Sequence, residues 1–276
     1  QKEYGLNIDY VNAERVKEVL PGIAGEGLLG GTFSPEDGSA SPLLAIHAFY
    51  RRALASGVAF HFRETVEEIM TEQGKIMGIR TGQGRYLAPV VVDAAGPHSA
   101  SLCRIAGIDL PVYPDSHEAA ITEPVKNFFG CMVVDLRPGP GSKNFYFYQN
   151  RLGQVVFCIT PDPALPGTDT KETSVFLPQV SARMVALLPR LKNLRVRRMW
   201  RGLYPMTPDG SPLVGWDRNL KGFLHATGMC GQGFMLGPGI GELVGRMIVS
   251  ETTPDDQTTL EEFSPYREFG GTEALK

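Results

Sequence analysis

The stretch GMCGQGFMLGPG, residues 228–239, joins two segments of different periodicity. The apolar run 223–227 before it predicts a strand, and the spacing of apolar residues over 234–250 predicts an amphipathic helix. A glycine turn between a strand and a helix is typical of an α/β layer. Such a turn also places free N–H groups and a positive dipole end at the start of the helix, where negative charge is stabilised. Spacing alone leaves two interpretations open, a ligand-binding loop and close helix–strand packing.

A second strand–turn–helix unit lies earlier in the chain. The sequence VVVDAAG at residues 90–96 is typical of a buried strand that ends in small residues, and a helix is predicted over 99–106. Ser41 followed by Pro42 is typical of a helix start, with serine as the N-cap and proline at the first helical position. The same patterns predict helices over 9–20, 42–56 and 174–188, and strands over 58–62, 66–70, 76–80 and 196–204.

The middle of the chain is β-rich. Residues 112–134 and 145–160 alternate as strands do, and the consecutive aromatics FYFY from Phe145 place aromatic side chains on both sides of one strand. The sequence therefore predicts a mixed α/β fold in which an antiparallel, β-rich domain at about residues 111–199 is inserted into an α/β part.

The composition excludes several classes of protein. The 276 residues carry a net charge of −3, which offers no basic surface for nucleic acid. No apolar run approaches the ~18 residues of a membrane span, and no secretory signal opens the chain. The cysteines lack the spacing of metal ligands, so we expect no metal site, free thiols and a cytoplasmic location. They are Cys103, Cys131, Cys158 and Cys230.

The sequence GEGLLG at residues 25–30 has the GxGxxG pattern of a dinucleotide-binding turn. That turn needs a strand before it and a helix that starts within it, because the helix aims backbone N–H groups at a pyrophosphate. Here Pro21 and Gly22 precede the pattern and Pro35 follows closely, so no helix can start. We interpret this segment as a loop.

Five segments, taken in order, resemble the FAD-dependent amine and amino-acid oxidoreductases, which include glycine oxidase, sarcosine oxidase and its heteromeric β subunit, and the β subunit of dye-linked L-proline dehydrogenase. The segments are SPEDG at 34–38, Thr65–Val66, DAAGPHS at 93–99, MTPDG at 206–210 and the glycine loop at 228–239. Each is weak alone, but all five in family order are specific. The family's GxGxxG unit would precede them, and the chain lacks it. We therefore expect the C-terminal part of such an enzyme, which binds FAD poorly by itself.

The resemblance implies a division of the chain. Residues 1–33 would connect to the missing FAD-binding region, residues 34–110 and 200–276 would belong to the FAD-binding domain, and residues 111–199 would bind substrate. In the family the glycine loop passes beside the isoalloxazine ring, and the following helix stabilises the negative charge of the reduced ring. The residues implied to contact FAD are Val66, Ala95, Gly96, Gly228, Met229, Cys230, Gly231, Gln232, Gly233, Phe234 and Met235.

Three tyrosines are the candidate catalytic residues. The resemblance places Tyr146 and Tyr148 on the strand that covers the flavin, and Tyr204 where glycine oxidase-like members have a carboxylate-binding arginine. The alternative for each tyrosine is packing within a sheet. Arg201 offers a fork for a carboxylate, but a surface charge is favoured, and His225 is interpreted as a core histidine.

Departures from the family pattern bear on the chemistry. Met235 stands where sarcosine oxidase-like members have a lysine. Gly202 stands where monomeric sarcosine oxidase has the cysteine that attaches its flavin, which excludes a covalent link there. No lysine of the kind that promotes oxygen reduction lies near residues 153–156. These departures favour a dehydrogenase over an oxidase.

The resemblance implies an enzyme that oxidises the C–N bond of a secondary amine or amino acid, of the sarcosine, proline or glycine type, to an imine. It implies a small-molecule substrate, with a partner subunit or another electron acceptor. Two alternatives stay open. One is a flavin-free fragment or assembly subunit, and the other is a 2-hydroxy acid or glycerol-phosphate oxidoreductase on the same fold.

Overall fold

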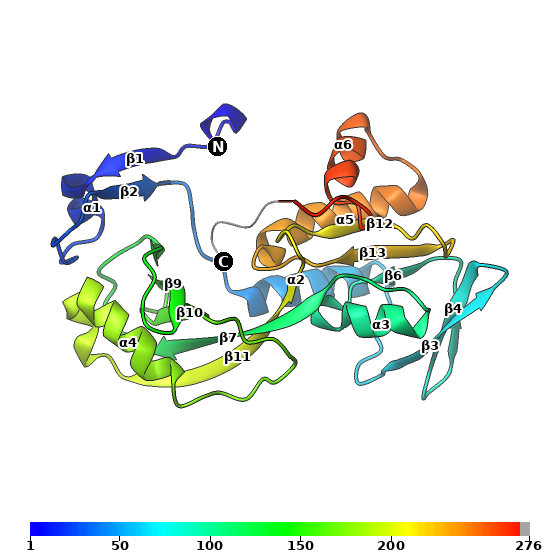
Figure 1. Ribbon diagram of the computed structural model, residues 1–276, viewed down its shortest axis with the longest axis horizontal. Coiled ribbons are helices and arrows are strands. Elements are labelled where there is room, and N and C mark those ends of the chain that lie inside the picture. Colours follow the sequence, from blue (N-terminus) through cyan, green and yellow to red (C-terminus); the bar gives the residue numbers. More distant parts are fainter. Residues whose placement is uncertain (271–276) are drawn as a thin grey trace.

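The computed structural model describes residues 1–270, which form two halves joined by two long antiparallel strands, β7 (Tyr113–Thr122) and β11 (Val196–Met206) (Figure 1). One half is a five-stranded antiparallel sheet that carries a helix on one face. The other half is a layered α/β unit. This is the mixed α/β architecture with an antiparallel, β-rich part that the sequence predicts.

The five-stranded sheet has the order β11-β7-β10-β9-β8. Because side chains alternate along a strand, Phe145 and Phe147 are buried in the core with helix α4, whereas Tyr146 and Tyr148 belong to the opposite face. Strand β11 extends to Met206, beyond the boundary expected at residue 199. The other elements of this half are β8 (Val133–Asp135), β9 (Ser142–Gln149), β10 (Val155–Pro161), α4 (Phe176–Leu187) and η3 (Pro189–Asn193).

In the second half, a small sheet lies between two helices. Strand β6 (Val91–Asp93) runs parallel to β13 (Phe223–Thr227), which pairs antiparallel with β12 (Leu213–Trp216). Helix α3 (Ser99–Ile105) packs on one face of this sheet and α5 (Gly233–Val249) packs on the other. Both strand–turn–helix units that the sequence predicts are therefore confirmed. A second small sheet consists of β3 (Val66–Glu72), β4 (Lys75–Thr81) and β5 (Arg85–Leu87).

The N-terminal segment differs from the prediction. Instead of one helix over residues 9–20, strand β1 (Asp9–Asn12) precedes helix α1 (Ala13–Val19). Strand β1 pairs with β2 (Gly30–Phe33), and the side chain of Asn12 accepts the N–H of Arg15 as an N-cap. The single predicted helix was wrong because a distant segment of the chain provides a strand with which residues 9–12 pair. The GxGxxG segment contains a turn at residues 26–27 and leads into β2 at Gly30, so no helix starts in it, as the sequence indicates.

Residues 58–62 form no strand, contrary to the prediction. The rings of Phe60 and Phe62 stack at a centroid distance of 6.0 Å, and Phe60 lies 4.7 Å from the ring of Tyr50 on the preceding helix. The alternating aromatic side chains therefore meet one another and a helix rather than a sheet.

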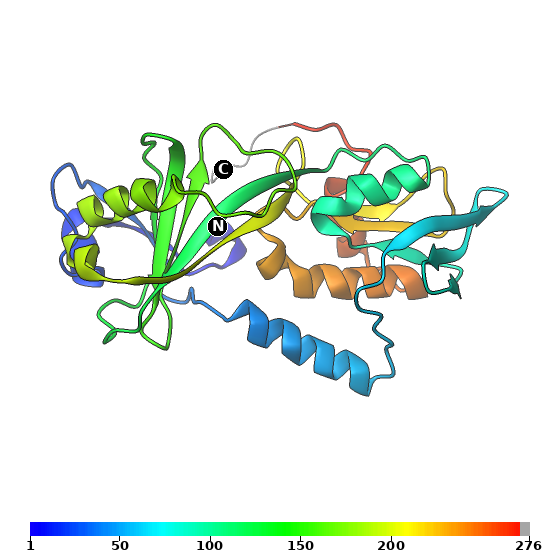
Figure 2. The same cartoon turned by 90° about the horizontal axis from the view of Figure 1, so that it is seen from below.

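Helix α2 (Pro42–Ala55) starts as predicted, because the Oγ of Ser41 accepts the N–H of Leu44. No residue of this helix is buried, and Leu43 and Phe49 are 78% and 63% exposed. Figure 2 shows α2 standing apart from the rest of the chain. Its apolar side chains therefore form a surface that the described residues do not cover.

Three shorter or terminal elements complete the fold. They are η1 (Lys2–Tyr4), η2 (Gly96–His98) and α6 (Pro254–Glu262). The cysteines form no disulfide with one another. Within residues 1–270, the helices are too short or too polar to cross a bilayer.

Candidate active site

The glycine loop that follows β13 requires glycine at its first position. Gly228 has a φ of 68°, in the left-handed region. A Cβ atom there would lie 2.6 Å from Cγ2 of Thr207. Further along, Cys230 also has a positive φ, and its N–H donates to the carbonyl of Pro205 over 3.1 Å. The loop is therefore fixed against the end of β11.

Helix α5 begins without a side-chain cap. Gln232 makes no capping hydrogen bond, and the first turn contains no acidic residue. The positive end of the helix is therefore available to an anion or to a group that becomes negative. Phe234 and Met235, in this first turn, are 51% and 72% exposed, and together with Tyr148 they line a cavity of about 470 Å³. The cavity is also lined by Gly38, Ser39, Ala40 and Met132.

Hydrogen bonds join the glycine loop to the segment at Ala95 and Gly96. The hydroxyl of Thr227, which precedes the loop, donates to the carbonyl of Gly96 over 3.3 Å and lies 2.6 Å from Oγ of Ser99. Asp93 accepts the hydroxyl of Ser99 and the N–H of Ala95, over 2.9 and 3.0 Å. These two predicted cofactor-binding segments therefore lie together.

Val66 is placed differently from the other predicted cofactor contacts. It lies at the start of β3 and packs against the core cluster that contains Ile69 and Cys103, beside helix α3. The structure therefore does not bring Val66 to the glycine loop, and its contact with a cofactor stays a prediction.

The three predicted tyrosines lie on one face of the five-stranded sheet. Tyr146 and Tyr204 are hydrogen-bonded through their side chains, and the Tyr204 ring packs so closely that a Cβ at Gly231 would lie 3.2 Å from its Cε1. Burial raises the pKa of Tyr146 and of Tyr148, so both hydroxyls stay protonated at neutral pH. The sheet thus forms a wall of hydroxyl groups opposite the glycine loop.

A histidine–aspartate pair lies beside this wall, and the sequence did not single it out. The ring of His117 stacks on Tyr204 at a centroid distance of 4.1 Å. Its Nε2 lies 3.2 Å from Oδ2 of Asp115, and each side chain is 11% exposed. The D-x-H spacing on strand β7 predicts that both side chains share a face. That spacing alone does not show which tyrosine faces them.

The sequence profile of the FAD dependent oxidoreductases, the DAO family, matches residues 1–247. The chain belongs to the DAO family. The resemblance found in the five sequence segments is therefore confirmed. The family is defined by its dependence on FAD.

Relatives agree with this family and fold. The D-amino acid dehydrogenase of Bradyrhizobium diazoefficiens is 28% identical over 264 residues, which cover 94% of this chain but 60% of that protein. The solved L-proline dehydrogenase of P. horikoshii matches with a TM-score of 0.89 at 29% identity, over 99% of this chain and 72% of that one. Glycine oxidase from Geobacillus kaustophilus matches with a TM-score of 0.86 at 24% identity, over 98% and 69% of the two chains. This DAO chain spans about three fifths of the length of the curated relative.

Arg201 of this DAO chain is not the surface charge that the sequence favoured. Its side chain is 9% exposed, and its guanidinium donates to Oγ of Ser116 over 3.0 Å and to the carbonyl of Lys171 over 3.2 Å. Within residues 1–270 its buried Nε has no hydrogen-bond partner. By strand alternation the side chain of Arg201 faces away from Tyr204, so Arg201 is not part of the face that carries the three tyrosines.

A second histidine–aspartate arrangement lies inside the α/β half. His225 is fully buried, as expected of a core histidine, with Nε2 3.2 Å from Oδ2 of Asp217 and Nδ1 4.0 Å from Oδ2 of Asp93. The thiol of Cys103 lies 3.4 Å from Asp93 and 3.9 Å from His225. Three side chains that could ligate a metal therefore meet here, although their sequence spacing does not indicate it. The same atoms already contact one another as hydrogen-bonding groups.

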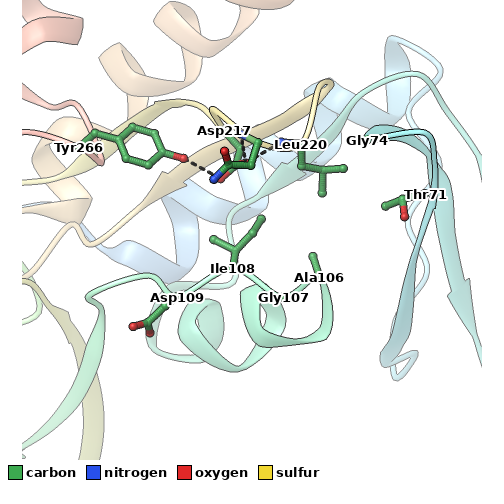
Figure 3. Close-up of a pocket in the computed structure, with 10 residues that line it drawn as sticks. Thr71, Gly74, Ala106, Gly107, Ile108, Asp109, Asp217, Leu220 and Tyr266 are labelled. Carbon is green, nitrogen blue, oxygen red and sulfur yellow. Dashed lines mark hydrogen bonds between the residues drawn. The ribbon is translucent and has the colours of Figure 1, made fainter.

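Figure 3 shows the outer end of this second arrangement. Tyr266 donates its hydroxyl to Oδ2 of Asp217 over 2.7 Å, and Leu220 donates its N–H to Oδ1 over 2.8 Å. Burial raises the pKa of Asp217, but hydrogen bonds from Tyr266, His225 and two backbone groups outweigh it and lower the pKa. A cavity of about 350 Å³ opens beside these residues, and none of its lining residues is a predicted site residue.

Proposed function

We propose that the protein containing this chain is a FAD-dependent dehydrogenase that oxidises the C–N bond of an amino acid or secondary amine to an imine. Two features of the structure that face one another support the proposal most strongly. The glycine loop with the uncapped start of α5 lies on one side, and the wall of Tyr146, Tyr148 and Tyr204 lies on the other. Membership of the DAO family supports the cofactor. The relatives named D-amino acid dehydrogenase, L-proline dehydrogenase and glycine oxidase support the substrate class.

The residues present fit a flavin ring. The exposed apolar side chains of Phe234 and Met235 offer a surface for an aromatic system, and Gly231 lets the backbone pass close to Tyr204. When bound, FAD would supply the acceptor for a hydride, and the start of α5 would stabilise negative charge on that acceptor. We assign the holding of the cofactor to Ala95, Gly96 and residues 228–235, with Val66 as the contact to the adenine.

The tyrosine wall fits the other reactant. Phenol hydroxyls that stay protonated donate hydrogen bonds to a carboxylate, which orients an amino acid over the ring. Met235 in place of a lysine leaves the cavity without a cation, which favours a small, partly apolar substrate such as proline or sarcosine. Electrons then leave to a partner subunit or another acceptor rather than to oxygen.

The two halves of the fold suit a division of labour. We assign cofactor binding to residues 34–110 and 200–276, and substrate binding to residues 111–199. The long strands β7 and β11 join the two parts and bring Tyr204 to the glycine loop.

The test is the visible spectrum of the whole protein that contains this chain, purified without added reductant. We expect a flavin band that bleaches under anaerobic conditions with proline, sarcosine, glycine or a D-amino acid. A flavin band that none of these bleaches, but that lactate or glycerol 3-phosphate bleaches, would replace the C–N proposal with the hydroxy-acid alternative.

A flavin-free assembly subunit is the second candidate. Helix α2 stands apart from the rest of the chain (Figure 2), and its exposed apolar side chains favour this candidate, because such a surface is typical of contact with more protein. A whole protein that stays colourless after FAD is added would support this candidate and contradict the dehydrogenase. Retention of stoichiometric FAD through gel filtration would exclude it.

A further inference from the structure

We propose that His117, oriented by Asp115, is the base that takes the proton from the substrate's ammonium group before its C–N bond is oxidised. This inference rests on the function proposed above and adds a catalytic residue to it. The placement carries the argument. His117 lies on the same face of the sheet as the tyrosine wall and stacks on Tyr204, which itself packs against the glycine loop at Gly231.

Asp115 fixes the orientation of the ring. One carboxylate oxygen accepts the N–H of Leu165 over 2.8 Å, and the other lies 3.2 Å from Nε2 of His117. Burial raises the pKa of Asp115, but the hydrogen bond and charge of His117 and two backbone N–H groups outweigh it and lower the pKa. An ionised Asp115 accepts a proton from Nε2, and this leaves the lone pair of the imidazole on Nδ1.

The Nδ1 atom is open to a ligand. Within residues 1–270 it has no hydrogen-bond partner, and it keeps some surface exposed to solvent. The pair as a whole is only 11% exposed on each side chain, so a bound substrate would exclude most of the remaining water. An imidazolium formed there is stabilised by the carboxylate behind it, as in other histidine–aspartate pairs that move protons.

The chemistry requires such a group. An amino acid carries its nitrogen as an ammonium at neutral pH, and an ammonium has no lone pair with which to form a C=N bond. Transfer of one N–H proton to Nδ1 gives the neutral amine and an imidazolium. The neutral amine then has the lone pair that the C=N bond needs, and FAD, when bound, would supply the acceptor for the Cα–H electron pair. The imidazolium afterwards returns its proton to water.

Other titratable groups surround the pair, but only Asp115 bonds the ring among the described residues. Glu118 and Arg201 belong to the opposite face of the sheet, where they bind Thr173 and Ser116. The remaining titratable groups on elements that pack against this face are Tyr146, Tyr204, Cys158 on β10 and, on η2, His98.

The first experiment compares the pH dependence of anaerobic flavin reduction in the whole protein and in its His117→Asn variant. We expect a loss of about 100-fold at pH 7. We also expect the loss to shrink as the pH rises, because the substrate then loses its ammonium proton to water. His61→Asn is the matched control, since His61 is exposed and lies in the other half of the fold.

The outcomes separate this inference from the function on which it rests. A His117→Asn variant that is slower by the same factor at every pH, or not slower at all, would overturn the base. A wild-type protein whose flavin no amino acid reduces at any pH would instead overturn the proposed function.

The second experiment needs no cofactor or turnover. Nitrogen-15 nuclear magnetic resonance of the histidine rings, with His117→Asn used for assignment, reports which ring nitrogen carries the proton in neutral His117. We expect the proton on Nε2 in the wild type, where Asp115 accepts it, and a mixture of both tautomers in Asp115→Asn. A wild-type ring with its proton on Nδ1, or the same tautomer in both proteins, would contradict the pair.

Discussion

Two histidine–aspartate arrangements occupy the two halves of the molecule, and their surroundings differ. His117 and Asp115 lie at a partly open face, and the ring has one nitrogen free of protein partners within residues 1–270. His225 lies between Asp217 and Asp93 with no exposed surface. We therefore assign different roles to the two pairs, because only a histidine that a ligand can reach can exchange a proton with it.

The closed arrangement has a structural consequence. Asp93, at the end of β6, also binds Ser99 and Ala95, and so fixes the turn that lies against the glycine loop. In the open arrangement Asp115 binds the backbone N–H groups of Leu165 and Ser116, and His117 stacks on Tyr204. We therefore expect changes in the closed arrangement to alter stability, and changes in the open one to alter catalysis.

The largest expected effect comes from breaking the closed arrangement. His225→Leu leaves Asp93 and Asp217 buried without their shared partner and should cost about 3–5 kcal/mol of unfolding free energy. His117→Leu should cost about 1 kcal/mol, because it removes a single hydrogen bond at a partly open site. Urea unfolding of both variants measures the difference. Equal losses would contradict the assignment of separate roles.

The glycine loop gives the next effect. Gly228→Ala should cost about 1–2 kcal/mol for its left-handed backbone, and the added Cβ would also displace Thr207 and weaken flavin binding. Gly245→Ala is the control, because it lies in helix α5 with open space around it and should gain about 1 kcal/mol. Thermal unfolding and FAD titration provide the two readings. A Gly228→Ala variant that binds FAD as the wild type does would remove this loop from the cofactor site.

Acid should act on the closed arrangement through Asp217. Its pKa is lowered in the folded chain, so it contributes stability above its unfolded pKa of about 3.9 and loses that contribution as the pH falls. Unfolding free energy measured from pH 7 down to pH 3 should therefore decline less steeply in Asp217→Asn than in the wild type. Parallel declines in the two proteins would show that the carboxylate is not stabilised by folding.

The smallest effect on stability is expected at the cavity rim. Met235→Lys should change unfolding free energy by less than about 0.5 kcal/mol, because the side chain is 72% exposed. It should nevertheless change which amino acids reduce the flavin, since Met235 lines the cavity beside Tyr148. Rates measured with proline, sarcosine and glycine test this. Identical relative rates would place the substrate elsewhere.

Local patterns in the sequence were enough to predict much of the fold. The strand and helix around the glycine loop, the Ser41 cap and the alternating faces of the FYFY strand all follow from neighbouring residues. The strand at Asp9–Asn12 could not be predicted in this way, because its partner at Gly30–Phe33 lies across an intervening helix. Pairing between distant segments overrode the local helical spacing.

The site was less accessible from the sequence. The three tyrosines were predicted through a resemblance and stay a prediction, whereas His117 and Asp115 gave only a D-x-H spacing that many exposed strands share. Their significance depends on Tyr204, which a different strand brings to His117. Arg201 was misjudged for the same reason, because Ser116 and Lys171 from elsewhere in the chain enclose it.

We assign the open pair and the three tyrosines to the substrate and the glycine loop to the flavin ring. A crystal structure of the whole protein with FAD and a bound, unreactive amino-acid analogue would show both placements at once. We expect the flavin ring against residues 229–235, the carboxylate on the tyrosine hydroxyls and the amine nitrogen within hydrogen-bond distance of Nδ1 of His117. An analogue bound with its nitrogen away from His117, or a flavin ring away from this loop, would overturn the assignment.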